Sequence, residues 1–326
     1  MSVVDWNESL FPPPPQVKED IFKFIDSDRL ENYPDISNKI LLQSLSDYTK
    51  LPIECIEAYN GSDDALRDIF TAFVDESKSV LSYQPTYSQV DTFIETNTNL
   101  YNKKEIIDPL GEHLYDFSLC GSYDVVYLVN PNNPTGKLIQ VKQIEKLASS
   151  SPNTLFVIDE AYYEYSNVTC SELILKYKNI LVTRTFSKAF GIASLRLGYV
   201  LGFPSTLDEL KKIKNGKCVN AMALVAGTAC LKDLEYLHSC VKHTKRSTAM
   251  FMQEISKLKD HFVVESVSNY VLFQVPNVED FKKKMESNKI LIRDRSYLTN
   301  LERCVRINLG PMKHTKKIIK IMKEKL

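Results

Sequence analysis

The stretch DVVYLVNPNNPTG at residues 124–136 decides the fold, because a short apolar run passes directly into a polar turn. The apolar run predicts a buried strand. Two later stretches repeat this arrangement, LFVIDEAY at 155–162 and ILVTRTFSK at 180–188. Helical periodicity at 63–74 and 141–148 accompanies these runs. Strands that alternate with helices favour a mostly parallel sheet covered by helices on both faces.

We expect two domains preceded by an arm. Residues 1–35 lack a core pattern and include Pro12–Pro15, which predicts a short polyproline II segment; this arm is expected to pack on the small domain or on a partner subunit. Residues 36–235 are expected to form the large domain, and residues 236–326 a smaller α+β domain that follows a long helical stretch at 220–258. Further expected elements are strands at 79–81, 197–201, 262–264, 270–275, 290–292 and 305–308, and helices at 277–287 and 312–325.

The composition disfavours several classes of protein. Lys plus Arg equals Asp plus Glu, at 41 each, and this zero net charge gives no reason to expect nucleic acid or an anionic membrane as a partner. No apolar run approaches the ~18 residues of a membrane-spanning helix. Seven cysteines without C-x-x-C spacing predict free thiols and a cytoplasmic protein. The five His residues lack ligand spacing, so no metal site is expected.

Side chains that could take part in binding or catalysis follow three of the predicted strands. The turn at 130–136 follows the first, Asp159 and Tyr162 follow the second, and Ser187 and Lys188 follow the third. Each motif alone is ordinary turn or helix-start chemistry. Ligands of open α/β sheets bind outside the carboxyl ends of the strands. The occurrence of all three motifs at strand ends therefore favours a single site. No His accompanies Ser187 in a triad, whereas a lysine with an acid and a phenol favours a cofactor held through a Schiff base.

These motifs resemble those of the fold-type-I aminotransferases, which bind pyridoxal 5′-phosphate (PLP). The resemblance runs from about residue 5 to the C-terminus, and Arg196 follows Lys188 by eight residues, as in that family. It implies an α/β fold of the fold-type-I PLP-transferase kind, a large domain with a mostly parallel central sheet plus a smaller α+β domain. Within this class the chain is most similar to histidinol-phosphate aminotransferases and threonine-phosphate decarboxylases. The supporting motifs are WNES at 6–9, YPD at 33–35, GSDD at 61–64, PTY at 85–87, RDRS at 293–296 and VRINLG at 305–310.

The resemblance implies a role for each residue that faces the cofactor ring. Lys188 holds PLP covalently, and its amine, once freed by substrate, moves the Cα proton. Asp159 pairs with the protonated pyridine nitrogen and so keeps the ring an electron sink. Tyr162 and Asn133 hydrogen-bond the phenolic oxygen of the ring. Tyr87 stacks on the ring face.

The resemblance also implies a cradle for the cofactor phosphate. The backbone N–H groups of Ser62 and Asp63 lie at an expected helix N-terminus, where the helix dipole favours an anion. Ser187 adds a hydroxyl and Arg196 adds a cation. Tyr33 reaches the phosphate from the partner subunit, as the tyrosine of YPD does in relatives. The expected assembly is therefore a homodimer with shared active sites.

Arginines are the candidates for binding a small amino or keto substrate. Arg306 is expected to bind the substrate carboxylate, because its planar fork matches a carboxylate bidentately. Arg293 is the candidate for a substrate phosphate, by resemblance to the RDRS-type segment. The alternative is that Arg293 only pairs with Asp294 or Glu302 on the surface.

Two departures from the family bear on the substrate and leave the reaction open. Residues 216–218 read Gly-Lys-Cys where relatives carry Pro-Tyr-Asn, and Phe11 stands where a tyrosine would offer a hydroxyl. The first hypothesis is an aminotransferase acting between glutamate and a small phosphorylated ketone, such as the keto partner of histidinol phosphate. The second is a decarboxylase of threonine phosphate or serine phosphate. A non-catalytic regulator is disfavoured because Lys188 and Asp159 are both present.

Overall fold

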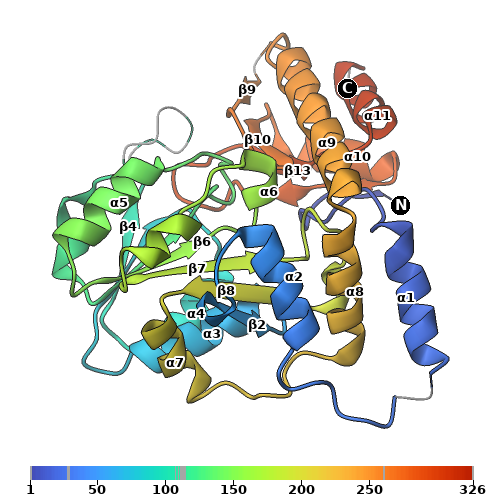
Figure 1. Ribbon diagram of the computed structural model, residues 1–326. Coiled ribbons are helices and arrows are strands. Elements are labelled where there is room, and N and C mark those ends of the chain that lie inside the picture. The colour runs from blue at the N-terminus through green and yellow to red at the C-terminus, as the bar shows by residue number, and fades with distance from the viewer. Residues whose placement is uncertain are drawn as a thin grey trace.

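The computed structural model describes residues 2–27, 30–106, 108, 110, 115–259 and 261–324. A seven-stranded sheet with strand order β2-β8-β7-β6-β5-β3-β4 forms the centre of the larger part (Figure 1). Its strands are β2 (Ile56–Tyr59), β3 (Val80–Gln84), β4 (Tyr101–Glu105), β5 (Val125–Val129), β6 (Leu155–Asp159), β7 (Ile180–Thr185) and β8 (Gly198–Gly202). Strands β3 to β7 run parallel, whereas β8 runs antiparallel to both of its neighbours. The expected mostly parallel sheet is therefore confirmed.

Every residue of β5, β6 and β7 is buried, as their continuous apolar runs predict for strands covered on both faces. The register pairs Val129 with Asp159, and Asp159 with Thr183. The carboxyl ends of these strands therefore lie side by side at one edge. The expected strands at this edge are confirmed, whereas β2 and β4 were not predicted. Strand β4 reads YNKKE at the border of the sheet, where exposure hides the apolar alternation.

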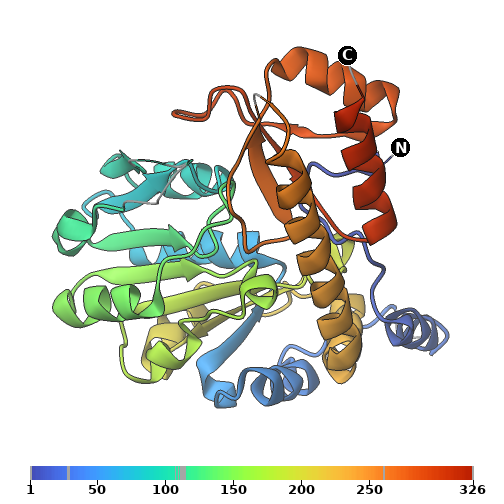
Figure 2. The ribbon, with the colours of Figure 1, turned by 90° about the horizontal axis from the view of Figure 1, so that it is seen from above.

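Helices cover both faces of the sheet and enclose two separate cores (Figures 1 and 2). One face carries α2 (Lys39–Thr49), α5 (Val141–Ser150), α6 (Tyr163–Ser166) and α8 (Ala221–Lys232), and α1 (Pro15–Ile25) packs on α8. The other carries α3 (Ser62–Phe73), α4 (Gln89–Glu95) and α7 (Pro204–Lys211). Short 3₁₀ helices are η1 (Ile53–Cys55), η2 (Phe117–Ser122), η3 (Ser171–Leu175) and η4 (Ala193–Leu195). Because strand side chains alternate, Tyr127, Val129 and Val157 belong to the core on the α3 side.

A four-stranded antiparallel sheet with order β12-β13-β10-β9 forms the smaller part. Its elements are β9 (Phe262–Val263), β10 (Tyr270–Gln274), β12 (Arg293–Asp294), β13 (Cys304–Asn308), α9 (Leu234–Ile255), α10 (Val278–Ser287) and α11 (Met312–Lys323). The expected helix at 312–325 thus ends at Lys323, and residues 325 and 326 lie outside the described part. Within the described ranges, none of the helices combines the length and the hydropathy of a membrane-spanning segment.

The N-terminal arm is more ordered than its sequence pattern indicates. Ser2–Val3 forms β1, which pairs in parallel with β11 (Ile290–Leu291), and Val4 is fully buried in the core of the smaller part. Figures 1 and 2 both place this end of the chain beside the smaller part. Pro14 is extended, but Pro15 begins α1, because a proline fits the first turn of a helix. The arm therefore contributes to the core of the smaller part, although its sequence shows no core pattern.

The stretch expected to be helical at 220–258 is two helices. Asp233 lies between α8 and α9 with φ −120° and ψ 64°, outside the helical region. Its carboxylate accepts a hydrogen bond from the Tyr236 N–H at 3.0 Å. An aspartate in this position caps a helix N-terminus, so a new helix axis starts there.

Candidate active site

A cavity of about 590 Å³ lies where the carboxyl ends of β5, β6 and β7 face the smaller part. Sequence-predicted residues that line it are Ser62, Asp63, Tyr87, Asn133, Asp159, Tyr162, Ser187, Lys188, Arg196, Arg293 and Arg306. The fold therefore brings together residues that are far apart in the chain. Tyr33 is the one sequence-predicted site residue that is not among them.

Asp159 ends β6 and is 3% exposed. The Tyr127 hydroxyl donates a hydrogen bond to its Oδ2 at 2.8 Å, and the Ala161 N–H donates to its Oδ1 at 3.1 Å. Burial raises the pKa of Asp159 to about 6, although these hydrogen bonds oppose the rise. Asp159 is not a helix N-cap, since α6 begins at Tyr163. A buried carboxylate at a cavity wall is suited to a cationic partner.

Lys188 and Tyr162 share the cavity wall with the N-terminal segment. The Lys188 Nζ donates to the Trp6 carbonyl oxygen at 2.9 Å and lies 5.9 Å from the centre of the Tyr162 ring. The Asn7 Nδ2 donates to the Tyr162 hydroxyl oxygen at 3.0 Å. That bond uses an acceptor of Tyr162, so the phenolic proton stays available to a group in the cavity.

The start of α3 presents groups that suit an anion. Gly61 precedes the helix with φ +88°, and a Cβ at this position would come within 2.8 Å of the Arg196 Nη2. Arg196 therefore packs directly on the backbone where the helix begins. Its guanidinium lies 3.0 Å from Asp63 and 3.3 Å from the Ser187 Oγ. The Tyr87 hydroxyl donates to Asp63 at 2.7 Å. Helix N–H groups, a hydroxyl and a cation suit a phosphate.

Three arginines of the smaller part reach the cavity. Arg306 is 3% exposed; its Nη1 donates to the Asn133 Oδ1, its Nη2 donates to the Asp5 carbonyl oxygen, and its buried Nε has no partner. Burial and the nearby Arg295 lower the pKa of Arg306 to about 10. Neither Arg293, Arg295 nor Arg306 forms an ion pair within the described part of the chain. The surface pairing considered for Arg293 is therefore not found there.

The two departures from the family lie away from this cavity. The Lys217 Nζ stands 4.0 Å from the ring centre of Tyr33, which is 78% exposed. The ring of Phe11 lies 6.2 Å from that of His243, and Phe11 is not among the lining residues. Both departures therefore affect the chain's outer surface rather than its own cavity.

Sequence reasoning missed the contribution of the N-terminal segment. Asp5, Trp6, Asn7 and Glu8 all line the cavity. Asn7 is 1% exposed and has a φ of 56°, in the left-handed region that asparagine tolerates better than most residues. The Asn269 Nδ2 donates to its carbonyl oxygen at 3.1 Å. The signal was the WNES motif, which was used for the resemblance to the family but not to place residues 5–8 in the site.

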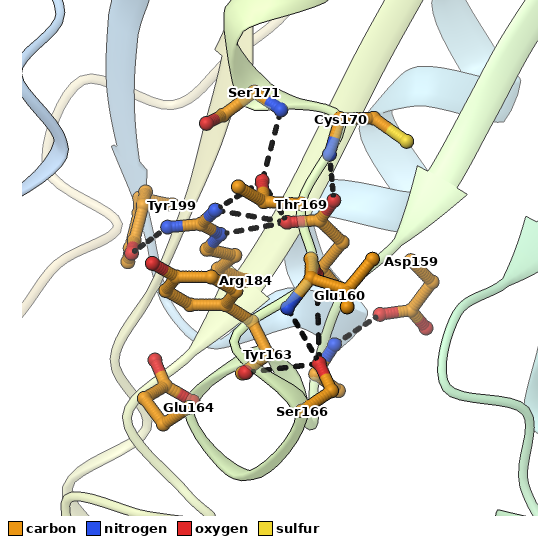
Figure 3. A network of polar contacts seen from close by, with 12 residues as sticks. Asp159, Glu160, Tyr163, Glu164, Ser166, Thr169, Cys170, Ser171, Arg184 and Tyr199 are labelled. Carbon is orange, nitrogen blue, oxygen red and sulfur yellow. Dashed lines mark hydrogen bonds and ion pairs between the residues drawn. The ribbon is translucent and has the colours of Figure 1, made fainter. Parts of the chain in front are cut away.

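A buried ion pair joins the ends of β6 and β7 (Figure 3). Arg184 on β7 lies 2.9 Å from Glu160, which directly follows β6, and both side chains are almost completely buried. The Thr169 hydroxyl donates to Glu160 at 2.8 Å, and the Arg184 guanidinium stacks 3.7 Å from the centre of the Tyr163 ring. Burial raises the pKa of the nearby Glu164 to about 7. This network ties the strand that carries Asp159 to the strand that leads to Lys188.

We predict that Arg184→Leu lowers the free energy of unfolding by about 3–5 kcal/mol, because Glu160 is left as an uncompensated buried charge. Urea unfolding of the purified protein measures this loss. The double variant Arg184→Leu/Glu160→Leu is the control, and it should recover much of the stability because the Glu160 charge is removed as well. A single variant as stable as wild type would show that the pair does not secure this edge.

Comparison with known proteins agrees with this geometry. Residues 3–322 match the family of class I and II aminotransferases. The chain is 33% identical to a dihydroxyacetone phosphate transaminase of Campylobacter jejuni, over 94% of this chain and 85% of that protein. It is 32% identical to a histidinol-phosphate aminotransferase of Geotalea daltonii, over 96% of this chain and 89% of that protein.

Solved structures share the fold. The histidinol-phosphate aminotransferase of Sinorhizobium meliloti, solved in complex with PLP, superposes with a TM-score of 0.88 at 24% identity, covering 98% of this chain and 89% of that one. The L-threonine-O-3-phosphate decarboxylase of Porphyromonas gingivalis gives 0.86 at 24% identity, covering 99% and 98%. The resemblance inferred from the motifs is confirmed: the chain belongs to the class I and II aminotransferases, a family of PLP-dependent enzymes.

Proposed function

We propose that this aminotransferase moves an amino group between glutamate and a small phosphorylated ketone. The first candidate for this ketone is the keto partner of histidinol phosphate. The observation that carries the proposal is that Arg293, Arg295 and Arg306 line the same cavity as Lys188 and Asp159 and are not neutralised by ion pairs within the described chain. Unpaired arginines suit both the phosphate of such a ketone and the carboxylate of glutamate.

The residues of the cavity fit PLP. When bound, PLP supplies an electron sink for the negative charge that develops at the substrate Cα. We assign the buried Asp159 carboxylate to the protonated ring nitrogen. Tyr162 and Asn133 are assigned to the phenolic oxygen, because Asn7 and Arg306 occupy their acceptor atoms and leave their donor groups available.

The remaining cofactor contacts follow from the start of α3. The N–H groups of Ser62 and Asp63, with Ser187 and Arg196, are assigned to the cofactor phosphate. Tyr87 is assigned to the ring face, with its hydroxyl held by Asp63.

Lys188 is assigned the movement of the proton at the substrate Cα. Its amine lies at the cavity wall, where the Trp6 carbonyl accepts a hydrogen bond from it. This bond orients the amine and leaves it within the space that a substrate would enter. A positioned base of this kind contributes about 10²–10⁴-fold to a rate.

Arg306 is assigned to the carboxylate of glutamate and Arg293 to the phosphate of the ketone. We predict that Arg293→Ala raises KM for a phosphorylated ketone by about tenfold or more, because a charge-assisted hydrogen bond is lost. The change for the same ketone without its phosphate should be small. Arg246→Ala on α9 is the matched surface control. Equal changes for both ketones would remove Arg293 from the phosphate site.

We also propose a cytoplasmic homodimer in which Tyr33 completes the site of the partner subunit. Tyr33, Ile36 and Ile40 are exposed by 78%, 57% and 71%, which is a large apolar surface for a free monomer. Tyr33 lies outside its own chain's cavity and is therefore available to a second copy.

We predict that mixing the inactive variants Tyr33→Ala and Lys188→Ala restores activity. Random exchange of subunits leaves one intact site in each mixed dimer, so up to about a quarter of wild-type activity should return. Activity is measured before and after subunit exchange. No recovery, with exchange verified by mass spectrometry, would mean that each site is built from one chain.

A further inference from the structure

Tyr127 touches the buried carboxylate of the site from outside the cavity. It lies on β5, is 1% exposed, and is not among the residues that line the cavity. We propose that Tyr127 is a positioning residue that orients Asp159 and favours its charged form for pairing with the ring nitrogen of PLP. The proposal rests on the placement of Asp159 opposite that nitrogen.

The sheet geometry aims Tyr127 at Asp159. In the parallel register Tyr127 pairs with Val157 and Val129 pairs with Asp159, so Tyr127 stands two residues below the end of the strand. All four side chains point to the same face of the sheet. Val129 lines the cavity, whereas Tyr127 spans the layer beneath it and places its hydroxyl 2.8 Å from the Asp159 Oδ2.

The phenol is held in this orientation from the side. Phe70 of α3 packs edge-on against it, with ring centres 6.0 Å apart and planes at 68°. Such edge-to-face contacts favour one ring orientation. The tyrosine hydroxyl is thereby fixed without any contact of its own to the cavity.

The hydrogen bond has one direction. Burial and the negative charge of Asp159 raise the pKa of Tyr127 well above its ordinary value, so the phenol stays protonated and donates. The Ala161 N–H holds the other carboxylate oxygen at 3.1 Å. Asp159 is therefore bonded on both oxygens, and its remaining acceptor capacity opens into the cavity that it lines.

Removing the donor should change the charge state of Asp159. Burial raises the pKa of this carboxyl to about 6, and the hydrogen bond from Tyr127 is the largest opposing effect. Without that bond the protonated form persists to higher pH, and a neutral carboxyl attracts a cationic ring nitrogen less. The other titratable groups that line the same cavity are Asp5, Glu8, Asp63, Tyr87, Tyr162, Lys188, Arg196, Arg293, Arg295 and Arg306.

The chain offers a matched control for a test. Tyr127→Phe removes only the hydroxyl. The Tyr101 hydroxyl on β4 also donates to an aspartate, the Asp91 Oδ1 at 2.7 Å, and neither residue lines the cavity. Tyr101→Phe therefore removes a tyrosine–aspartate hydrogen bond of the same sheet that lies away from the cavity.

The measurement is the affinity of the full-length protein for PLP between pH 5 and 9, followed by fluorescence titration. For Tyr127→Phe we expect an affinity about tenfold lower at pH 7, and a loss of affinity on acidification that begins about one pH unit higher than in wild type. Tyr101→Phe should match wild type. Unchanged affinity and an unchanged pH profile in Tyr127→Phe would overturn the proposal.

A second ligand separates positioning from a general structural effect. A PLP analogue with carbon in place of the ring nitrogen cannot pair with Asp159, so wild type and Tyr127→Phe should bind it equally. An equal loss for PLP and for the analogue would overturn the proposal.

A double-mutant cycle with Asp159→Asn gives an independent test of the same contact. In the Asp159→Asn background, Tyr127→Phe should have no further effect on PLP affinity, and additive losses would overturn the proposal. These binding results do not depend on the amino donor, so they stand apart from any failure of the transamination assay.

Discussion

Lys188→Ala is expected to abolish transamination, with kcat lowered by about 10²–10⁴-fold or more, because the variant loses both the covalent hold on PLP and the base that moves the Cα proton. The structure places this amine at the cavity wall, 2.9 Å from the Trp6 carbonyl oxygen. Steady-state assays of the purified variant measure the loss. The absorbance of the lysine-bound cofactor should disappear with it.

The control is a surface lysine of the larger part of the molecule. Lys142→Ala on α5 should retain wild-type activity, because this exposed side chain is remote from the lining residues. Addition of a small primary amine to Lys188→Ala should restore part of the rate, since an external base can replace the missing one. Full turnover by Lys188→Ala without added amine would remove Lys188 from its assigned role.

Asp159→Asn should lower kcat by orders of magnitude and at the same time stabilise the protein without cofactor. The amide keeps the size of the side chain but cannot balance a cationic ring nitrogen, so the electron sink is lost. In the wild-type protein, burial raises the pKa of Asp159 from 3.8 to about 6. Keeping this carboxylate charged at neutral pH costs about 3 kcal/mol, which the variant avoids.

The raised pKa of Asp159 also determines how stability changes with pH. Between the unfolded value of 3.8 and the folded value of about 6, the folded chain holds the proton more tightly than the unfolded chain. The contribution of Asp159 to stability is therefore lost as pH rises through this range. Urea unfolding from pH 4 to 8 should show this decline in wild type and a smaller decline in Asp159→Asn. An Asp159→Asn protein that is less stable than wild type at pH 7 would contradict it.

The strand ends of the site could be predicted from the sequence because local patterns determine them. Val125–Val129 is a continuous apolar run with a polar turn behind it, and β5 has these same bounds. Asp159 and Lys188 follow runs of the same kind, so the parallel sheet brings them to one edge. Assigning Ser62 and Asp63 to a helix start needed only the GSDD motif, and α3 begins at Ser62.

Contacts between distant segments could not be predicted in the same way. Asn7 reaches Tyr162 across 155 positions of the chain, and Arg306 reaches the Asp5 carbonyl across 301. No periodicity encodes such contacts, because they depend on where the arm packs. Tyr127 could not be predicted for another reason. Within an apolar strand it resembles any other buried residue, and its proximity to Asp159 depends on the register of β5 against β6.

The most direct test of the account is a half-reaction of the purified holoenzyme with L-glutamate in the absence of any ketone. The account predicts release of 2-oxoglutarate in an amount equal to the active sites, with a matching change in the absorbance of the bound cofactor. Absence of 2-oxoglutarate, together with carbon dioxide release from threonine phosphate or serine phosphate, would contradict it and assign the cavity to a decarboxylase.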